Sequence, residues 1–120
     1  MDNASYAPSK PQQDVDGFFA YDVRVGTVLT ARPNPGARVP AYILEIDFGP
    51  IGRRVTSAQL TRHYRPDDLV GRQVVAVVNF PPKRIAGVKS EVLVLGGVPE
   101  PGDVILLHPD HPVPNGTPVA

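Results

Sequence analysis

Basic side chains gather in one proline-bounded segment of this sequence. The apolar run 73–79 leads into Phe80-Pro81-Pro82, and residues 83–89 then carry Lys83, Arg84 and Lys89. Prolines reduce the freedom that a loop loses on binding, so these cations can be presented at low entropic cost. Phosphates are the natural target, because they give affinity without base reading. A basic hairpin that serves only solubility is the alternative that spacing leaves open.

The distribution of charge supports the same chemistry although the formal net charge is zero. Residues 1–52 hold 4 basic and 6 acidic side chains, and residues 90–120 hold 4 acidic side chains and no basic one. Residues 53–89 hold 8 basic side chains against 2 acidic ones. This asymmetry predicts a dipolar surface that the total conceals. Solvated surface arginines are the alternative explanation.

Other reactive residues do not form a recognisable site. His108, Asp110 and His111 are potential metal ligands, but His63 is the one other histidine and there is no cysteine, whereas zinc sites need further ligands on a held framework. Ser57 with His63 lacks a third orienting group for nucleophilic catalysis. We therefore expect no metal, no cofactor and no enzymatic activity.

The elements that must position the basic segment are short strands. Alternating or β-branched runs predict strands at 23–30, 42–48, 53–56, 73–79, 91–95 and 103–107. Residues 57–64 read as the one helix, with Thr56 or Ser57 as its cap and Pro66 just past its end. Short connections imply antiparallel neighbours. An all-β, five-stranded OB-fold Greek-key barrel with one short helix is therefore expected.

The two ends of the chain differ in character from the barrel. We expect residues 1–14 to form a flexible tail and residues 15–120 to form the domain, including a C-terminal extension that serves dimerisation. The apolar 103–107 strand and the proline-rich end need a cover, which a twofold partner would supply. No apolar run is long enough to insert in a membrane, and no export signal is recognisable, which favours the cytoplasm.

Two motifs resemble a known family. One pattern of Asn, Pro, a basic pair, Gly and Ser is met by Asn79, Pro81, Lys83, Arg84, Gly87 and Ser90. An earlier Asp-x-Arg-x-Gly is met by Asp22, Arg24 and Gly26. In these motifs the chain resembles the tRNA-binding domain family, found alone or joined to some aminoacyl-tRNA synthetases. It is most similar to the stand-alone CsaA-type members, in the blocks 37–41, 46–49, 57–59, 79–82, 90–93 and 112–117.

The resemblance implies an OB-fold, a homodimer and tRNA recognised largely by shape. The expected RNA-binding residues are Lys83, Arg84, Lys89, Ser90, Arg53, Arg54 and Asn79, with Arg32 and Arg38 as weaker candidates. The hydroxyl of Ser90 could contact a phosphate or a 2′-hydroxyl, or it could cap the strand entrance. Synthetase-type members carry Leu-Lys-Pro where this chain has residues 80–82, so one cation is missing here.

The same resemblance implies a second function. CsaA-type proteins are also described as export chaperones that bind unfolded polypeptides or preproteins, with RNA binding then weak or vestigial. Phe18, Phe19, Phe80 and residues 92–95 are the candidate surface for such clients. Core or dimer contacts are the alternative role for each of them.

Overall fold

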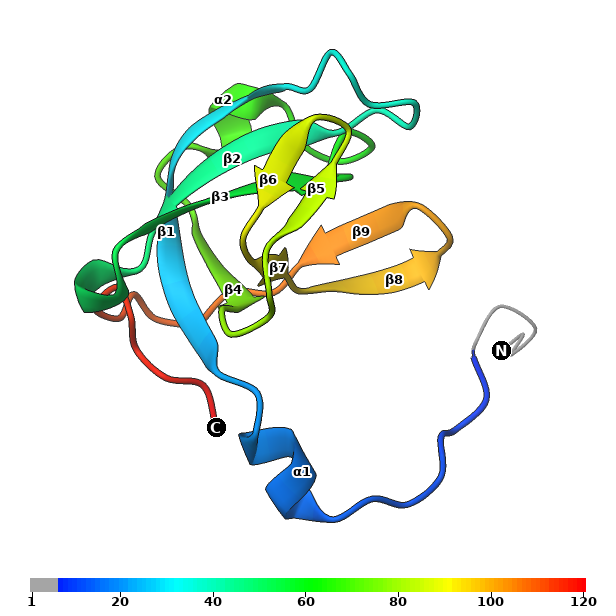
Figure 1. The fold of residues 1–120 in the computed structure, drawn as a ribbon, viewed down its shortest axis with the longest axis vertical. Helices are drawn as coiled ribbons and strands as arrows, with labels where there is room; N and C mark the ends of the chain where they lie inside the picture. The colour runs from blue at the N-terminus through cyan, green and yellow to red at the C-terminus, as the bar shows by residue number, and fades with distance from the viewer. Residues whose placement is uncertain (1–6) are drawn as a thin grey trace.

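The structure is a computed structural model that describes residues 7–120, so residues 1–6 of the expected tail lie outside the described part. Five antiparallel strands form one curled sheet in the order β3-β2-β1-β4-β7 (Figure 1). Their bounds are Val23–Pro33 for β1, Tyr42–Asp47 for β2, Arg53–Ala58 for β3, Gln73–Val77 for β4 and Leu93–Val94 for β7. Two further hairpins extend from this sheet: β5 (Lys83–Ile85) with β6 (Val88–Ser90), and β8 (Gly96–Glu100) with β9 (Asp103–Leu106).

The two edge strands of the sheet nearly close it into a barrel. The backbone N–H of Glu91, just before β7, donates to the carbonyl of Val55 in β3 at 2.8 Å. The hydroxyl of Thr56 donates to the carbonyl of Val92 at 2.8 Å. The last strand thus lies between the third and fourth barrel strands, as the Greek-key order of an OB-fold requires. The predicted fold class is confirmed.

The helices differ from the prediction. The described residues form two short α-helices, α1 (Val15–Phe19) and α2 (Pro66–Leu69), and one 3-10 turn, η1 (Gly49–Ile51). The prediction of a helix at 57–64 is wrong, because β3 continues to Ala58, which pairs with Tyr42 of β2. Pro66 does not end a helix but begins α2, since proline at the first helical position loses no hydrogen bond.

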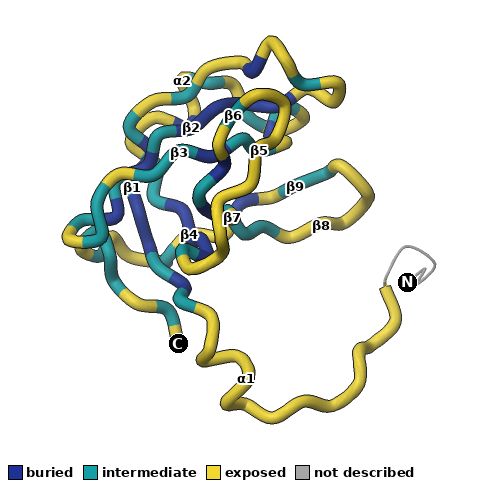
Figure 2. The backbone as a smooth tube through the Cα atoms, in the orientation of Figure 1, coloured by how far each residue is buried: buried dark blue, intermediate teal, exposed yellow. Residues whose placement is uncertain are grey.

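The barrel interior explains the predicted strands. Leu44, Ile46 and Phe48 from β2 and its end are completely buried (Figure 2). The β-branched run of β4 is covered on both faces, as expected: Val74 points into the main core, and Val75 belongs to a second, outer cluster. This outer cluster needs a cover that the five strands do not supply.

The C-terminal segment supplies that cover within the same chain. The N–H of Gly116 donates to the carbonyl of Val25 at 2.7 Å, and that of Val119 donates to the carbonyl of Val23 at 2.8 Å. Val113 and Val119 pack on the outer cluster. The prolines prevent regular structure but not docking, and residues 113–119 lie along β1.

The Asp-x-Arg-x-Gly motif serves this docking. The guanidinium of Arg24 contacts the carboxylate of Asp22 and donates to the carbonyl of Gly116 at 3.0 Å. A Cβ atom on Gly26 would lie 2.7 Å from the Phe48 ring and 2.8 Å from Ile46, closer than van der Waals contact allows. The motif is therefore structural: it holds the tail on β1 and lets the core close over β1.

Candidate nucleic-acid interface

The basic segment folds as the β5–β6 hairpin rather than as a loop. Its turn is Ala86-Gly87, and both residues have positive φ, 48° and 82°, as a type I′ turn requires. In the ladder Lys83 pairs with Ser90, Arg84 with Lys89, and Ile85 with Val88. Residues directly opposite each other share a face of a hairpin, so the register sorts the cations.

Arg84 and Lys89 form the outer face of this hairpin. Two like charges directly opposite each other on a sheet repel, and both side chains are exposed. The Arg84 guanidinium donates to the carbonyl of Gly87 at 3.0 Å, which holds it over the turn. A bound anion between the two cations would relieve their repulsion.

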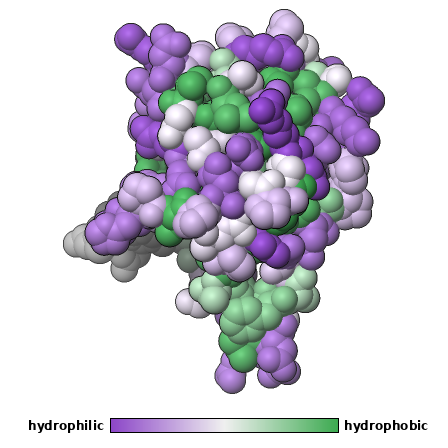
Figure 3. Space-filling view, turned by 90° about the vertical axis from the view of Figure 1, so that its left-hand side faces the viewer, coloured by the Kyte–Doolittle hydropathy of each residue, from purple (hydrophilic) through white to green (hydrophobic). Residues whose placement is uncertain are grey.

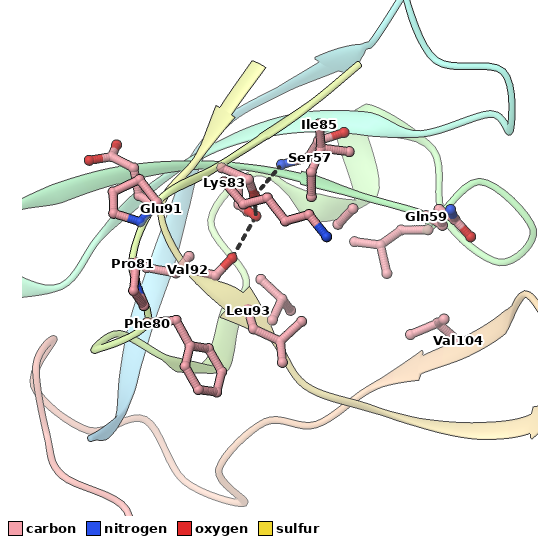
Figure 4. Close-up of a pocket in the computed structure, with 16 residues that line it drawn as sticks. Ser57, Gln59, Phe80, Pro81, Lys83, Ile85, Glu91, Val92, Leu93 and Val104 are labelled. Carbon is pink, nitrogen blue, oxygen red and sulfur yellow. Dashed lines mark hydrogen bonds between the residues drawn. The ribbon is translucent and has the colours of Figure 1, made fainter. Parts of the chain in front are cut away.

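Lys83 lies on the other face of the hairpin, together with Ile85 and Ser90. Figure 4 shows the side chains of Lys83 and Ile85 beside Ser57 of β3, at the rim of a groove. The two neighbouring cations Lys83 and Arg84 therefore do not form one patch on one face.

The loop between β1 and β2 meets the tip of this hairpin. A Cβ atom on Gly36 would lie 2.9 Å from the carbonyl oxygen of Ala86. Asn34 is buried and organises the loop: its Oδ1 accepts from the N–H of Gly36 at 3.1 Å, and its Nδ2 donates to the hydroxyl of Ser57 at 3.3 Å. Arg32, near the end of β1, and Arg38, in the loop, are exposed. The structure thus brings the loop that carries Arg38, and with it the end of β1, to the tip of the hairpin that carries Arg84.

These cations are not neutralised by the protein. Within residues 7–120, no carboxylate lies within salt-bridge distance of Lys83, Arg84, Lys89, Arg32 or Arg38. In OB-folds the equivalent loops, between the first two strands and between the last two, bind oligonucleotides. We call Arg32, Arg38, Arg84 and Lys89 with their two loops the basic rim.

Arg53 and Arg54 lie away from the basic rim. They begin β3 beside η1, whereas the hairpin packs near the other end of that strand (Figure 1). The guanidinium of Arg53 contacts Glu45 at 3.2 Å, and that of Arg54 donates to the carbonyl of Arg53 at 2.9 Å. Any contact of these two arginines with RNA needs a ligand that spans the length of β3.

Asn79 and Ser90 already have protein partners. Oδ1 of Asn79 accepts from the N–H of Asp22 at 2.9 Å, and its Nδ2 donates to the carbonyl of Ala20 at 3.0 Å. Ser90 is 7% exposed, and its hydroxyl lies 2.7 Å from that of Thr56. In this arrangement Asn79 fixes the entrance to β1 and Ser90 fixes the base of the hairpin.

An apolar groove lies on the inner side of the hairpin (Figure 4). Of the residues expected to form a client surface, Phe80 and residues 92–94 line it, whereas Phe18 and Phe19 do not. It encloses about 700 Å³ where β3 and β7, the two edges of the sheet, diverge. Its walls come from the end of β3, the Phe80–Pro82 corner, the hairpin, β7 and β9. Its apolar lining is Ala58, Leu60, Phe80, Pro81, Pro82, Ile85, Val92, Leu93, Val94 and Val104.

The histidines of the C-terminal segment do not meet further ligands in the described residues. Among residues 7–120, no three His, Cys, Asp or Glu side chains are grouped so as to hold a metal ion. Nδ1 of His108 lies 2.9 Å from the carbonyl of Pro109. Nor does any helix in this part of the chain have the length and apolarity to cross a membrane.

Comparison with known proteins places this geometry in a family. A family model described as "Putative tRNA binding domain" matches residues 23–118. The crystal structure of the chaperone CsaA from Bacillus anthracis is 57% identical with a TM-score of 0.88, covering 92% of this chain and 100% of that one. The CsaA chaperone protein of Picrophilus torridus is 41% identical with a TM-score of 0.83, covering 91% of this chain and 100% of that one.

Curated relatives show the same domain in a longer context. The methionine–tRNA ligase of Methanothrix thermoacetophila is 41% identical over 107 residues, which is 89% of this chain but 15% of the ligase. The chain thus spans about one sixth of the ligases it matches. The barrel, the motifs and these matches agree, and the chain belongs to the tRNA-binding domain family as a CsaA-like member.

Proposed function

We propose that this domain binds tRNA on the basic rim, by charge and shape rather than by sequence. The observation that carries the proposal is the placement of Arg84 opposite Lys89, next to the loop of Arg32 and Arg38, with no carboxylate paired to any of the four in residues 7–120. The family match and the likeness to methionine–tRNA ligases support tRNA as the partner.

The side chains on the rim fit backbone recognition. Guanidinium and ammonium groups pair with phosphates and release counterions, which gives salt-dependent affinity. Binding of single strands uses exposed aromatic side chains on which the bases stack. Of the large exposed aromatic side chains in the described residues, Phe18, Phe19 and Tyr21 lie outside both loops of the rim. Phe80 lies in the second loop but lines the groove, not the outer face of the hairpin that carries Arg84 and Lys89. This arrangement supports recognition of a folded RNA by its backbone.

The test is an electrophoretic titration of total tRNA with the wild type and with the variant Arg84→Ala plus Lys89→Ala. We expect weaker binding to every tRNA and a flatter salt dependence, because two phosphate contacts are lost. Unchanged affinity in a folded variant would reject the basic rim as the binding surface. Arg53→Ala plus Arg54→Ala, tested alongside, measures whether the RNA reaches the far end of β3.

A second candidate function is polypeptide binding in the groove. Its wall is mostly apolar, and Leu93 at its floor is 51% exposed, which costs free energy in a domain without a ligand there. The similar CsaA structures are those of chaperones, which supports an unfolded or preprotein segment as the occupant. The groove lining carries one cation, Lys83, and one anion, Glu91, so its charge favours neither acidic nor basic segments.

The groove has its own test. Ile85→Gln removes apolar lining without a change of charge, so affinity for a labelled unfolded polypeptide should fall about fivefold to tenfold. Val39→Gln, on the β1–β2 loop outside the groove, is the matched control. Equal polypeptide affinity in the two variants would show that the groove is not the polypeptide-binding site.

The remaining proposals concern the protein's setting. We propose that the domain is itself non-catalytic, that it acts in the cytoplasm where tRNA is charged and used, and that it is a homodimer. The aminoacylation of the similar ligases is not assigned to this chain, which matches only a small part of them.

A further inference from the structure

Glu91 joins the two edges of the barrel through both its backbone and its side chain. Its N–H donates to the carbonyl of Val55 at 2.8 Å, and its Oε1 accepts from the N–H of Val55 at 3.0 Å. One residue thus satisfies both backbone groups that β3 turns outward at Val55, as a neighbouring strand would. The bond to the side chain needs an oxygen acceptor, which glutamine also has. The closure of the barrel therefore does not explain why this residue is charged.

The negative charge of Glu91 is not paired with a cation. Among residues 7–120, the carboxylates that form salt bridges are those of Asp22, Glu45, Asp103 and Asp110. Oε2 of Glu91 accepts no hydrogen bond in this part of the chain, and it faces solvent, since no buried side-chain oxygen there is left without a partner. An unpaired carboxylate in solvent acts over roughly a Debye length, which is about 10 Å at 0.1 M salt.

Both the basic rim and the groove lie within that range. Lys89 of the rim is two residues away in the chain, about 7 Å along an extended strand. Glu91 also lines the groove, where Figure 4 shows it on the side opposite Val104. Lys83, the one cation of that lining, pairs across the hairpin with Ser90, the neighbour of Glu91. The carboxylate therefore lies where the two surfaces meet.

Without a nearby negative charge, Lys83 would extend the positive surface of the rim into the groove. It adjoins Arg84 of the rim in the chain and lies on the opposite face of the hairpin. The exposed apolar surface of α1 has no such cation: its side chains project below the barrel in Figure 3, and it contains Asp16 and no Lys or Arg. The groove, unlike α1, is thus linked to the basic rim by a cation.

We propose that Glu91 determines which ligand each surface takes, because it balances the charge of Lys83 in the groove. Every nucleotide of RNA carries a phosphate charge, so a groove without net charge does not attract tRNA beyond the rim. An apolar polypeptide segment enters the groove regardless of this balance. Rejection of the wrong ligand by a placed charge is a general route to specificity. This inference rests on the proposed binding of tRNA to the basic rim and names a specificity-determining residue for it.

Glu91→Gln tests the balance, because it removes the charge and keeps an acceptor for the N–H of Val55. Lys83 then contacts one further phosphate. The slope of log affinity against log salt should therefore steepen by about 0.7–0.9, and tRNA affinity should rise about fivefold at 0.1 M salt. Addition of Lys83→Ala to this variant should restore the wild-type slope. Glu100→Gln, at the exposed end of β8, removes the same charge outside the rim and the groove and is the control.

Leu93→Lys changes the same balance without touching the closure of the barrel. Leu93 is exposed at the floor of the groove, so a lysine fits there without repacking and adds a cation that Glu91 does not offset. Affinity for tRNA should rise as it does in Glu91→Gln. This second variant keeps the test decisive if Glu91→Gln lowers the melting temperature of the domain.

The outcomes separate the role of Glu91 from the proposed function. If the wild type binds tRNA and both Glu91→Gln and Leu93→Lys keep its affinity and slope, the role of Glu91 is overturned and the basic rim stands. An equal gain in Glu100→Gln would reduce the effect to net charge and overturn that role as well. Absence of tRNA binding by the wild type would overturn the proposed function itself. In a competition assay, saturating tRNA should weaken polypeptide binding by Glu91→Gln but not by the wild type, and equal competition in both would contradict the inference.

Discussion

Replacement of Arg84 and Lys89 by alanine separates the roles of charge and fold in the hairpin. Each phosphate contact adds about 0.7–0.9 to the slope of log affinity against log salt. Loss of two contacts should therefore flatten the slope by about 1.5. At 0.1 M salt this amounts to roughly a 30-fold loss of affinity, and near 1 M salt the loss should almost vanish.

The same substitution should not destabilise the protein. Arg84 and Lys89 are exposed and lie directly opposite each other, so their removal relieves a like-charge repulsion of roughly 0.2–1 kcal/mol. Thermal unfolding should show equal or slightly higher stability. A gain in stability together with a loss of tRNA affinity is the signature of a surface that is selected for binding.

The assay is filter binding of total tRNA at salt concentrations from low to physiological and above. Lys10→Ala plus Arg62→Ala removes the same charge from exposed positions outside the basic rim and serves as the control. The reasoning is refuted if the hairpin variant folds normally and keeps both the wild-type affinity and the wild-type slope. A loss that is equal in the control would mean that only net charge matters.

Three other predictions concern the framework and the absence of a metal. Gly26→Ala should lower the free energy of unfolding by about 1–3 kcal/mol in urea titrations, because its Cβ would meet Phe48 and Ile46 inside van der Waals distance. Asn79→Ala should cost about 1–3 kcal/mol and leave the salt slope for tRNA unchanged, since its two bonds hold backbone; a changed slope would restore it as an RNA ligand. Chelators should change neither melting temperature nor tRNA affinity, and a drop in either would show that His108 or His111 binds a metal.

The sequence predicted the barrel because its strands carry strong local patterns. The alternation at 23–30 and the β-branched run at 73–79 match β1 and β4. β1 differs in one respect from the single buried face that its alternation predicts: Val23 and Val25 lie in the outer cluster, whereas Val28 lies in the main core, so both faces are covered. The helix at 57–64 was predicted from capping residues and a following proline. Residues 57 and 58 instead extend β3, because their backbone pairing with β2 stabilises a strand more than the local sequence favours a helix.

The sequence predicted which residue types form the candidate site, but not which face of the hairpin each cation occupies. The register of a hairpin depends on its turn, and Ala86-Gly87 is a weaker turn signal than Asn-Gly. Residues 83–89 were expected to form a loop and not a hairpin, so the strand alternation that puts Lys83 and Arg84 on opposite faces could not be applied. The groove and the contact between Gly36 and Ala86 join segments far apart in the chain, and no local pattern reports such contacts.

Mapping the tRNA contact on the protein by amide chemical shifts tests the central claim most directly. Unlabelled tRNA titrated into ¹⁵N-labelled protein should shift and broaden the amides of residues 32–38 and 84–89. The amides of α1 and of the outer face of β9 should stay in place. Changes confined to α1, β9 or the groove, with residues 84–89 unaffected, would contradict the basic rim as the tRNA-binding surface.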